Sequence, residues 1–300
     1  MHVHEERIPS YAADSVARGR SPGILLPPGV DPAENPDAVA SYVIALDSVN
    51  FGSGYFPHLR KRPDHSGYRT IEASLHDLFR DQGSLSAQEL RSIDARKTAA
   101  IFGQNLEHPV QRSLMSLFAK AWNELGSFLL ESFAGSFSAL VEAADHSAAR
   151  LAEWLTEMPM FRDVAGYDGR EVAFYKRAQI VPADLALAFS GEGFGWFHDL
   201  DQLTSFADNL VPHVLRSDGI LEYEPSLEAR IHRGELIVAG SNAEVEIRAC
   251  AVHAVELIVA EMRRIGAQTS AMQIDHILWN RGQTRFYKDH PRHRTRTAFY

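Results

Sequence analysis

The chain has 300 residues, of which 45% are hydrophobic and 23% are charged, and its net charge at pH 7 is −9. This composition is typical of a soluble globular protein that is large enough to bury a substantial core. The excess of acids argues against a general nucleic-acid binder, because such proteins usually carry a basic face.

The cysteine content and the hydrophobic pattern indicate the cellular compartment of the protein. The single cysteine, Cys250, excludes an internal disulfide and a multi-cysteine metal site, and it fits a reducing cytosol. The first ten residues lack the apolar run of a signal peptide, and no run is long enough to span a membrane. We therefore expect a cytoplasmic protein without a membrane partner.

The N-terminal part is predicted to be irregular over residues 1–34 and to lead into a single domain over 35–300. The prolines of this lead-in favour an extended chain; they are Pro22, Pro27, Pro28 and Pro32. Asn35 followed by Pro36 then predicts the start of a buried helix that ends near Asn50. The loop 50–61 follows, and its glycines and aromatic rings either line a pocket or form a turn over the core.

Helical patterns continue over residues 70–157. They predict helices over 70–83 and 86–103, the second with a capping box from Ser86 to Glu89. Antiparallel scaffold helices are expected over 108–157, with breaks near Gly126, Gly135 and His146. This region is predicted to be mainly scaffold.

One β-hairpin is predicted over residues 161–176. Asp168-Gly169 is a strong two-residue turn signal between runs rich in Val, Phe and Tyr. A two-stranded ribbon is not stable alone, so we expect it to pack on helices. A helix over 177–190 follows, in which Pro182 either causes a kink or marks the start.

Residues 191–219 combine aromatic rings, acids and a helix that ends at Gly219. The rings include Phe197, and the acids are Asp199, Asp201 and Asp208. Rings beside carboxylates suit a flat, polar, cationic ligand. The alternative is a helix N-terminus capped by its acids beside ordinary core aromatics.

Two further helices are predicted. Residues 241–266 have a capping box from Ser241 to Glu244, and Glu244, Glu246 and Arg248 form either structural ion pairs or a buried polar network.

Residues 270–282 form the second of these helices, with Ser270 as N-cap and Gly282 as stop. It carries Asp275 and Trp279 on one face, which points either to solvent or to a ligand cavity.

The last segment, residues 284–300, concentrates positive charge. Its cations are Arg285, Lys288, Arg292, Arg294 and Arg296. Such a cluster can bind a small phosphate, whereas the ordinary interpretation is a solvated tail. The aromatic ending Phe299-Tyr300 argues against the tail, because exposed rings gain nothing there.

Several cofactor and metal chemistries find no support. GEGFG has the wrong spacing for a dinucleotide fingerprint, and the Walker, HExxH and GxSxG motifs are missing from the sequence. His198, Asp199 and Asp201 are potential metal ligands, but no second cluster has ligand spacing. We therefore expect neither a metal nor a cofactor.

Several blocks, in a specific order, resemble the queuosine salvage protein family, and the resemblance covers most of the chain after about residue 35. The blocks are NFGSGYFPH (50–58), MFRDVAGYDG to FYKRAQI (160–180), FHDLDQLTSFADNLVPHVL (197–215), GELIVAGSNAEVEIRACAVHAVELI (234–258), IDHILW (274–279) and HRTRTAFY (293–300). Two departures stand out. Family members often have Tyr-Arg where this chain has Asn209-Leu210, and others have an acid where it has Asn280.

The resemblance implies hydrolysis of the N-glycosidic bond of queuosine 5′-phosphate, with release of the free base queuine for tRNA modification. It also implies a mostly α-helical fold similar to helix-hairpin-helix DNA glycosylases and a small-molecule substrate. The net charge of −9 argues against a stable nucleic-acid complex. The residues that the resemblance places at the substrate are Asn50, Phe51, Lys176, Phe197, His198, Asp201, Trp279, Lys288, Arg294 and Tyr300. Rings would wall the base, and cations would pair with the 5′-phosphate.

Three acids are the catalytic candidates. Cleavage develops oxocarbenium character at the sugar, which a carboxylate can stabilise or attack. Because Asn280 cannot replace an acid as nucleophile, the hypothesis makes Asp275 the nucleophile or the stabiliser of the sugar cation, while Asp199 and Asp208 anchor and polarise the base. The alternatives are a DNA-lesion glycosylase and a non-catalytic protein that binds queuine or its nucleotide.

Overall fold

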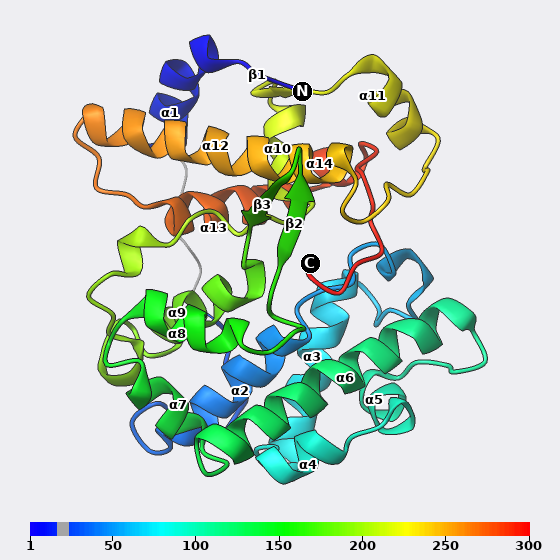
Figure 1. Cartoon of the computed structure of the whole chain (residues 1–300), viewed down its shortest axis with the longest axis vertical. Helices are drawn as coiled ribbons and strands as arrows, with labels where there is room; N and C mark the ends of the chain where they lie inside the picture. The colour runs from blue at the N-terminus through cyan, green and yellow to red at the C-terminus, as the bar shows by residue number, and fades with distance from the viewer. Residues whose placement is uncertain (17–23) are drawn as a thin grey trace.

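The computed structural model describes residues 1–16 and 24–300 and shows a mostly helical single domain (Figure 1). The helices form two groups, each around its own hydrophobic core. The first group consists of α2 (Pro36–Ser48), α3 (Gly67–Gln82), α4 (Ala87–Ser92), α5 (Ala95–Phe102), α6 (Pro109–Ser132), α7 (Phe137–Ala143), α8 (Ala148–Thr156) and α9 (Lys176–Ala188). The second consists of α1 (Ile8–Val16), α10 (Val211–Ser217), α11 (Pro225–His232), α12 (Asn242–Arg264), α13 (Ala271–Gly282) and α14 (Arg285–Lys288).

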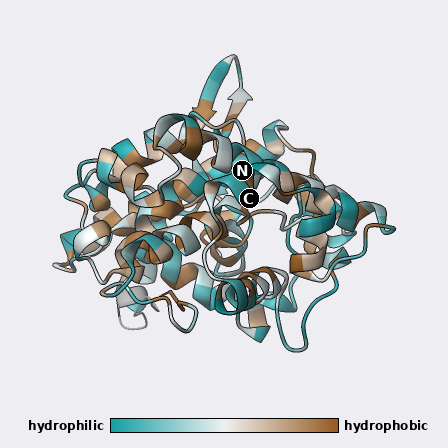
Figure 2. Cartoon of the chain, turned by 90° about the horizontal axis from the view of Figure 1, so that it is seen from below, coloured by the Kyte–Doolittle hydropathy of each residue, from teal (hydrophilic) through white to brown (hydrophobic). Residues whose placement is uncertain are grey.

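The expected β-hairpin is present and spans the two groups in Figure 1. Strands β2 (Val164–Tyr167) and β3 (Arg170–Ala173) pair antiparallel on either side of Asp168-Gly169. The ribbon packs on α12, where the Tyr167 hydroxyl donates to Glu246 Oε1 at 2.8 Å. Figure 2 shows hydrophobic and hydrophilic residues mixed along most helices, as expected for amphipathic helices around a core.

The prediction of an irregular lead-in over residues 1–34 is wrong for its first half. Strand β1 (His2–Val3) pairs antiparallel with β4 (Leu221–Glu222), the 3₁₀ turn η1 (Glu5–Arg7) follows, and α1 buries Ile8 and Ala12 in the second core. Tertiary contacts with distant segments therefore stabilise structure that the local pattern did not indicate. Residues 24–35 have no helix or strand, as expected, and Pro22 lies outside the described residues.

Several predicted helix ends are confirmed by their hydrogen bonds. The Asn35 side chain accepts from Ala38 N, and both halves of the Ser86–Glu89 capping box form. Ser270 caps α13, which includes Gly282 as its last residue. Helix α10 ends at Ser217, two residues before Gly219.

Other predicted boundaries are wrong. The expected helix over 86–103 is two helices, because Asp94 begins α5 as a new N-cap. The expected capping box at Ser241 does not form: its hydroxyl donates to Val238 O at 2.7 Å. Pro182 lies inside α9, which begins at Lys176.

The predicted helix break near Gly126 is absent, because α6 continues through this residue. A Cβ on Gly126 would lie 2.3 Å from Arg91 N and 2.5 Å from Ala87 O. The glycine therefore allows α4 to approach α6 closely. The expected breaks near Gly135 and His146 are present, between α6, α7 and α8.

Candidate active site

Two adjoining cavities lie where the two groups of helices meet, with volumes of about 340 and 400 Å³. We call them the acidic cavity and the basic cavity after the charges described below. Five residues line both of them and mark the junction: Asn50, Tyr68, Lys176, Asp208 and Trp279. Because they share these residues, the two cavities together form one bipartite site.

The junction residues come from segments far apart in the sequence. Asn50 follows the end of α2, Tyr68 lies in the first turn of α3, and Lys176 is the first residue of α9. Asp208 precedes α10, and Trp279 lies on α13. The site therefore forms only when both groups of helices are in place.

Asp275 and Asp208 are the two predicted catalytic acids that reach the site. Ser205 Oγ at 2.8 Å and Phe206 N at 2.9 Å both donate to Asp275 Oδ2. Burial, and then the nearby charge of Asp208, raise the pKa of Asp275 to about 8, although those hydrogen bonds and Lys176 oppose the shift. Asp275 is therefore protonated at neutral pH.

Asp208 lies at the junction in a setting that favours a carboxylate. Its Oδ1 accepts from Leu210 N at 2.7 Å and from Val211 N at 3.0 Å, at the start of α10. Backbone N–H groups at a helix N-terminus favour negative charge. Asp208 thus lies where the two cavities meet, with one carboxyl oxygen held by backbone donors.

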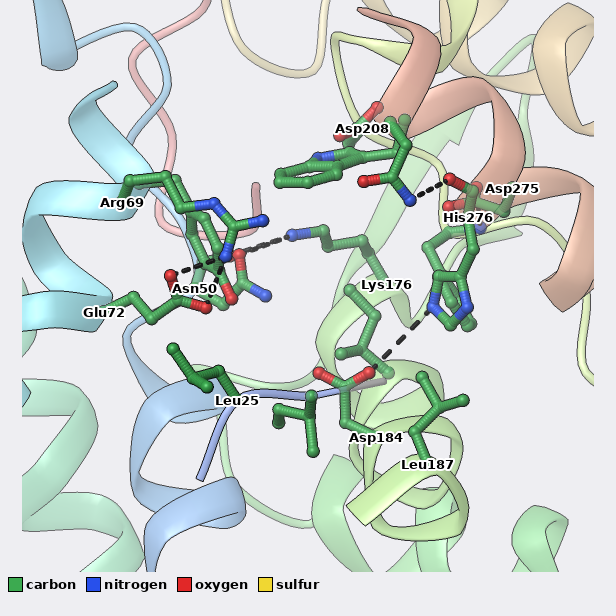
Figure 3. A pocket seen from close by; sticks show the side chains of 16 residues that line it. Leu25, Asn50, Arg69, Glu72, Lys176, Asp184, Leu187, Asp208, Asp275 and His276 are labelled. Atoms are coloured by element: carbon green, nitrogen blue, oxygen red, sulfur yellow. Dashed lines mark hydrogen bonds and ion pairs between the residues drawn. The ribbon is translucent and has the colours of Figure 1, made fainter. Parts of the chain in front are cut away.

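Lys176 lies in the centre of Figure 3, with Asp208 and Asp275 above it and Asp184 below. Its Nζ donates to the Asn50 carbonyl at 2.9 Å and contacts Asn50 Oδ1 at 3.3 Å. Burial lowers the pKa of Lys176, while Asp208 opposes the shift. The preceding Tyr175 has φ +49°, a backbone conformation that costs energy for a side chain of this size, and its strain lies at the site itself.

An aromatic wall with an ion pair closes one side of the site. The rings of Tyr68 and Trp279 meet edge to face with centroids 5.6 Å apart, and the Arg69 guanidinium lies 5.5 Å from the Trp279 ring. Arg69 Nη1 donates to both Glu72 oxygens, at 2.6 and 2.8 Å. Tyr68, Arg69 and Glu72 are not among the residues predicted from the sequence, although their i, i+1, i+4 spacing puts them on adjoining parts of one helix face.

Asp184 on α9 and His276 on α13 face each other across the acidic cavity, with Oδ1 and Nε2 4.0 Å apart (Figure 3). Burial raises the pKa of Asp184 to about 7, with Lys176 opposing and Glu72 adding to the shift, and burial lowers that of His276 to about 4. Neither residue is among those predicted from the sequence. One signal was present: Asp184 is a lone acid in the apolar run IVPADLALA.

The basic cavity carries the positive charge. Its cations besides Lys176 are Lys61, Lys288, Arg292 and Arg294. Burial lowers the pKa of Arg292, as does the neighbouring charge of Arg294. Ser53 Oγ, in the wall of this cavity, is buried without a hydrogen-bond partner among residues 1–16 and 24–300. Concentrated cations beside an unused hydroxyl suit an oxyanion.

The C-terminal segment is part of this wall and not a solvated tail. Ile237 N donates to Arg294 O at 2.9 Å, and Gly52 N donates to Tyr300 O at 2.9 Å. The Tyr300 ring lies 4.5 Å from the Arg248 guanidinium, which pairs with Asp163. Phe51 and Tyr300 both line the basic cavity, so the loop 50–61 serves the site and also packs on the core.

The remaining predicted site residues lie elsewhere. Asp199 accepts from Ser147 Oγ, Ala148 N and Ala149 N at 2.6–3.3 Å, so it caps α8. These bonds lower the pKa of Asp199 against the effect of its burial. Phe197 belongs to the first core, while His198 and Asp201 are exposed. None of these four lines either cavity.

Among the described residues, the group of His, Cys, Asp or Glu side chains compact enough to hold a metal is His2, His4 and Glu6, near the N-terminus. Within the same residues, no helix has the length and apolar character needed to cross a bilayer.

The fold and site define a helical protein with a bipartite pocket that is acidic at one end and basic at the other. The chain belongs to the queuosine salvage protein family, whose sequence profile matches residues 30–300. It is 42% identical to the queuosine 5′-phosphate N-glycosylase/hydrolase of Sphaerobacter thermophilus, over 88% of this chain and 82% of that protein. The proteins of the same name from Dictyostelium discoideum and Mus musculus are 34% and 32% identical, over 88% and 98% of this chain and 79% and 90% of theirs.

Proposed function

We propose that this protein hydrolyses the N-glycosidic bond of queuosine 5′-phosphate and releases queuine. The observation that carries the proposal is the bipartite site, in which an acidic cavity and a basic cavity meet at Asp208 and Lys176. The relatives that bear the name queuosine 5′-phosphate N-glycosylase/hydrolase support the same substrate.

The two ends of such a nucleotide match the two cavities. A flat deazaguanine with a cationic arm fits the acidic cavity between Trp279 and Phe206, and a 5′-phosphate fits the cations of the basic cavity. The ribose and its glycosidic bond then lie at the junction. Of the predicted substrate residues, Asn50, Phe51, Lys176, Trp279, Lys288, Arg294 and Tyr300 line this path.

The positions of the acids revise their expected roles. A carboxyl group that is protonated at neutral pH donates a proton, so Asp275 is the general acid and not the nucleophile. Asp208, at the junction, stabilises or attacks the sugar carbon as positive charge develops there. Lys176 and Asn50 orient the groups at this point.

The reaction balances with water as the only co-reactant. As the bond between the sugar carbon and the base nitrogen breaks, its electron pair goes to the base, and Asp275 gives that base a proton. Water then adds to the sugar carbon and its proton returns to Asp275. The products are queuine and ribose 5-phosphate.

The test is incubation of the purified protein with queuosine 5′-phosphate and, separately, with queuosine, followed by mass spectrometry of free queuine. We expect release from the phosphate and much slower release from the nucleoside, because the nucleoside leaves the basic cavity empty. No release, with a rise in melting temperature, would identify a binding protein. No release and no shift would refute the proposal.

Three finer expectations accompany this function. The fold is proposed to share the arrangement of helix-hairpin-helix DNA glycosylases, as the family resemblance implies. A cytoplasmic location is supported by the single cysteine and the reducing environment that it suits. A stable complex with nucleic acid is not expected for a chain with net charge −9, which a salt titration with duplex DNA would test.

A further inference from the structure

Helix α9 lines the acidic cavity along its length. Lys176, Ile180, Asp184 and Leu187 all border this cavity, and their spacing puts them on one helix face. Eight residues separate Lys176 from Asp184, which corresponds to about 12 Å along a helix. Asp184 therefore lies at the end of the cavity away from the junction, as Figure 3 shows.

Among the described residues, Asp184 has no lysine or arginine in ion-pair contact, and the cation that acts on it from further away is Lys176. Glu72, the acid that α3 contributes to this cavity, accepts hydrogen bonds from Arg69 Nη1 at both carboxylate oxygens, at 2.6 and 2.8 Å. The imidazole of His276 lies beside Asp184, with Nε2 4.0 Å from Oδ1, and its ring is neutral at pH 7 because burial lowers its pKa to about 4. A neutral imidazole at this distance does not balance a carboxylate.

A second acid lies behind Asp184 and increases the demand for a cation. Asp47 at the end of α2 is fully buried, and its Oδ2 has no hydrogen-bond donor among the described residues. Burial, and then the charge of Asp184, raise the pKa of Asp47 well above its ordinary value. Asp184 and Asp47 thus share the positive charge of Lys176, and Arg177 also acts on Asp47. A cation of the ligand in the acidic cavity would add to this charge and stabilise the Asp184 carboxylate.

We propose that Asp184 recognises the ammonium group of the aminomethyl arm of the queuine base and so distinguishes this base from uncharged deazaguanines. The inference rests on the proposed function. An alkyl amine of this kind is protonated at neutral pH, as lysine is. The apolar side chains of Ile180 and Leu187 beside Asp184 suit the hydrocarbon part of the arm. The proposal thus assigns specificity to Asp184 and bond cleavage to the junction.

The test compares two free bases and three proteins by calorimetric titration. The bases are queuine, which has the cationic arm, and 7-deazaguanine, which has none. The proteins are the wild type, Asp184→Asn, and the matched control Asp168→Asn, which makes the same change at the exposed hairpin turn. Free bases make the readout independent of catalysis, and hydrolysis of queuosine 5′-phosphate is measured in parallel.

We expect Asp184→Asn to weaken queuine binding about 10- to 100-fold, the usual range for a lost charged hydrogen bond, and to leave 7-deazaguanine binding within about threefold. The control is expected to bind both bases as the wild type does. Equal losses for both bases, or no loss for queuine, would overturn the role of Asp184.

The proposed function and this inference fail in different ways. A wild type that binds queuine through Asp184 but releases none from queuosine 5′-phosphate would refute hydrolysis and keep the ammonium site. Hydrolysis that is unaffected by Asp184→Asn, with unchanged queuine affinity, would refute only the ammonium site. Asparagine is neutral and nearly isosteric, so the variant is expected to fold, and its melting temperature checks this.

Discussion

At the scale of single residues, the main contrast is between Asp208 and Asp275, two acids with different surroundings. Asp208 accepts two backbone N–H bonds at the start of α10. Asp275 is buried near Asp208, and burial together with that neighbouring charge raises its pKa to about 8. Pairs of acids whose environments separate their protonation states commonly divide the acid and anion roles of hydrolysis.

A pH profile tests this division. If Asp275 is the general acid, kcat/KM stays level below about pH 8 and falls about tenfold per pH unit above it, because only the protonated carboxyl can donate. Asp275→Asn is expected to lower kcat at least about 100-fold and to lose this alkaline limb. Steady-state assays between pH 5 and 10 provide the measurement.

The same variant has a stability signature with a defined sign. The native state keeps a proton on Asp275 that the unfolded chain releases above the ordinary pKa of 3.8, so ionisation opposes folding. The contribution of Asp275 to the free energy of unfolding therefore decreases as the pH rises from about 4 to about 8. Asp275→Asn removes this decrease. An alkaline limb that persists in a folded Asp275→Asn protein would argue for another acid.

At the scale of elements, the C-terminal segment and the loop 50–61 depend on each other. A Cβ at Gly54 would lie 2.2 Å from Thr295 O and 2.9 Å from Arg296 N, both backbone atoms that cannot move alone. The segment holds Arg292, Arg294 and Tyr300 in the wall of the basic cavity. The position of the cations that we propose bind the phosphate therefore depends on a glycine in a different segment.

Gly54→Ala is expected to displace this wall, to raise KM for queuosine 5′-phosphate about tenfold or more, and to reduce stability by about 1–3 kcal/mol, the usual range for overpacking. The matched control is Gly166→Ala, since a Cβ there meets nothing within 4 Å. Kinetics and thermal unfolding of both variants give the comparison. Equal effects of the two alanines, or none at Gly54, would contradict the proposed dependence.

At the scale of the whole molecule, the site joins two hydrophobic cores. Lys176 and Tyr68 come from helices of the first core, and Asp275 and Trp279 come from α13 of the second. The buried pair Arg248–Asp163 also connects α12 to the segment before the hairpin. A ligand in the acidic cavity touches both groups of helices and stabilises their association.

Queuine at 100 times its Kd is expected to raise the free energy of unfolding by about 2.7 kcal/mol. For a domain of this size, that corresponds to a rise in melting temperature of about 3–5 °C. Because the ligand contacts both groups, calorimetry is expected to show one transition that shifts as a whole. Two transitions, of which only one responds to queuine, would place the ligand on a single group of helices.

The sequence by itself determined the helical class, the hairpin at Asp168-Gly169, most of the caps and the family. These features depend on local chemistry: proline at the first helical position, a hydroxyl at an N-cap, or a turn that tolerates positive φ. It also placed Asp275 and Trp279 on one helix face, since that spacing is a property of any α-helix.

Only the tertiary structure decided which acids share a cavity. Asp199 and Asp208 look alike in the sequence, yet one caps α8 and the other lies at the junction. Asp184 and Glu72 became site residues because α9 and α3 face the same space. The pKa of Asp275 likewise depends on its burial and on Asp208, which is 67 positions away in the chain. Local sequence patterns indicate neither of these influences.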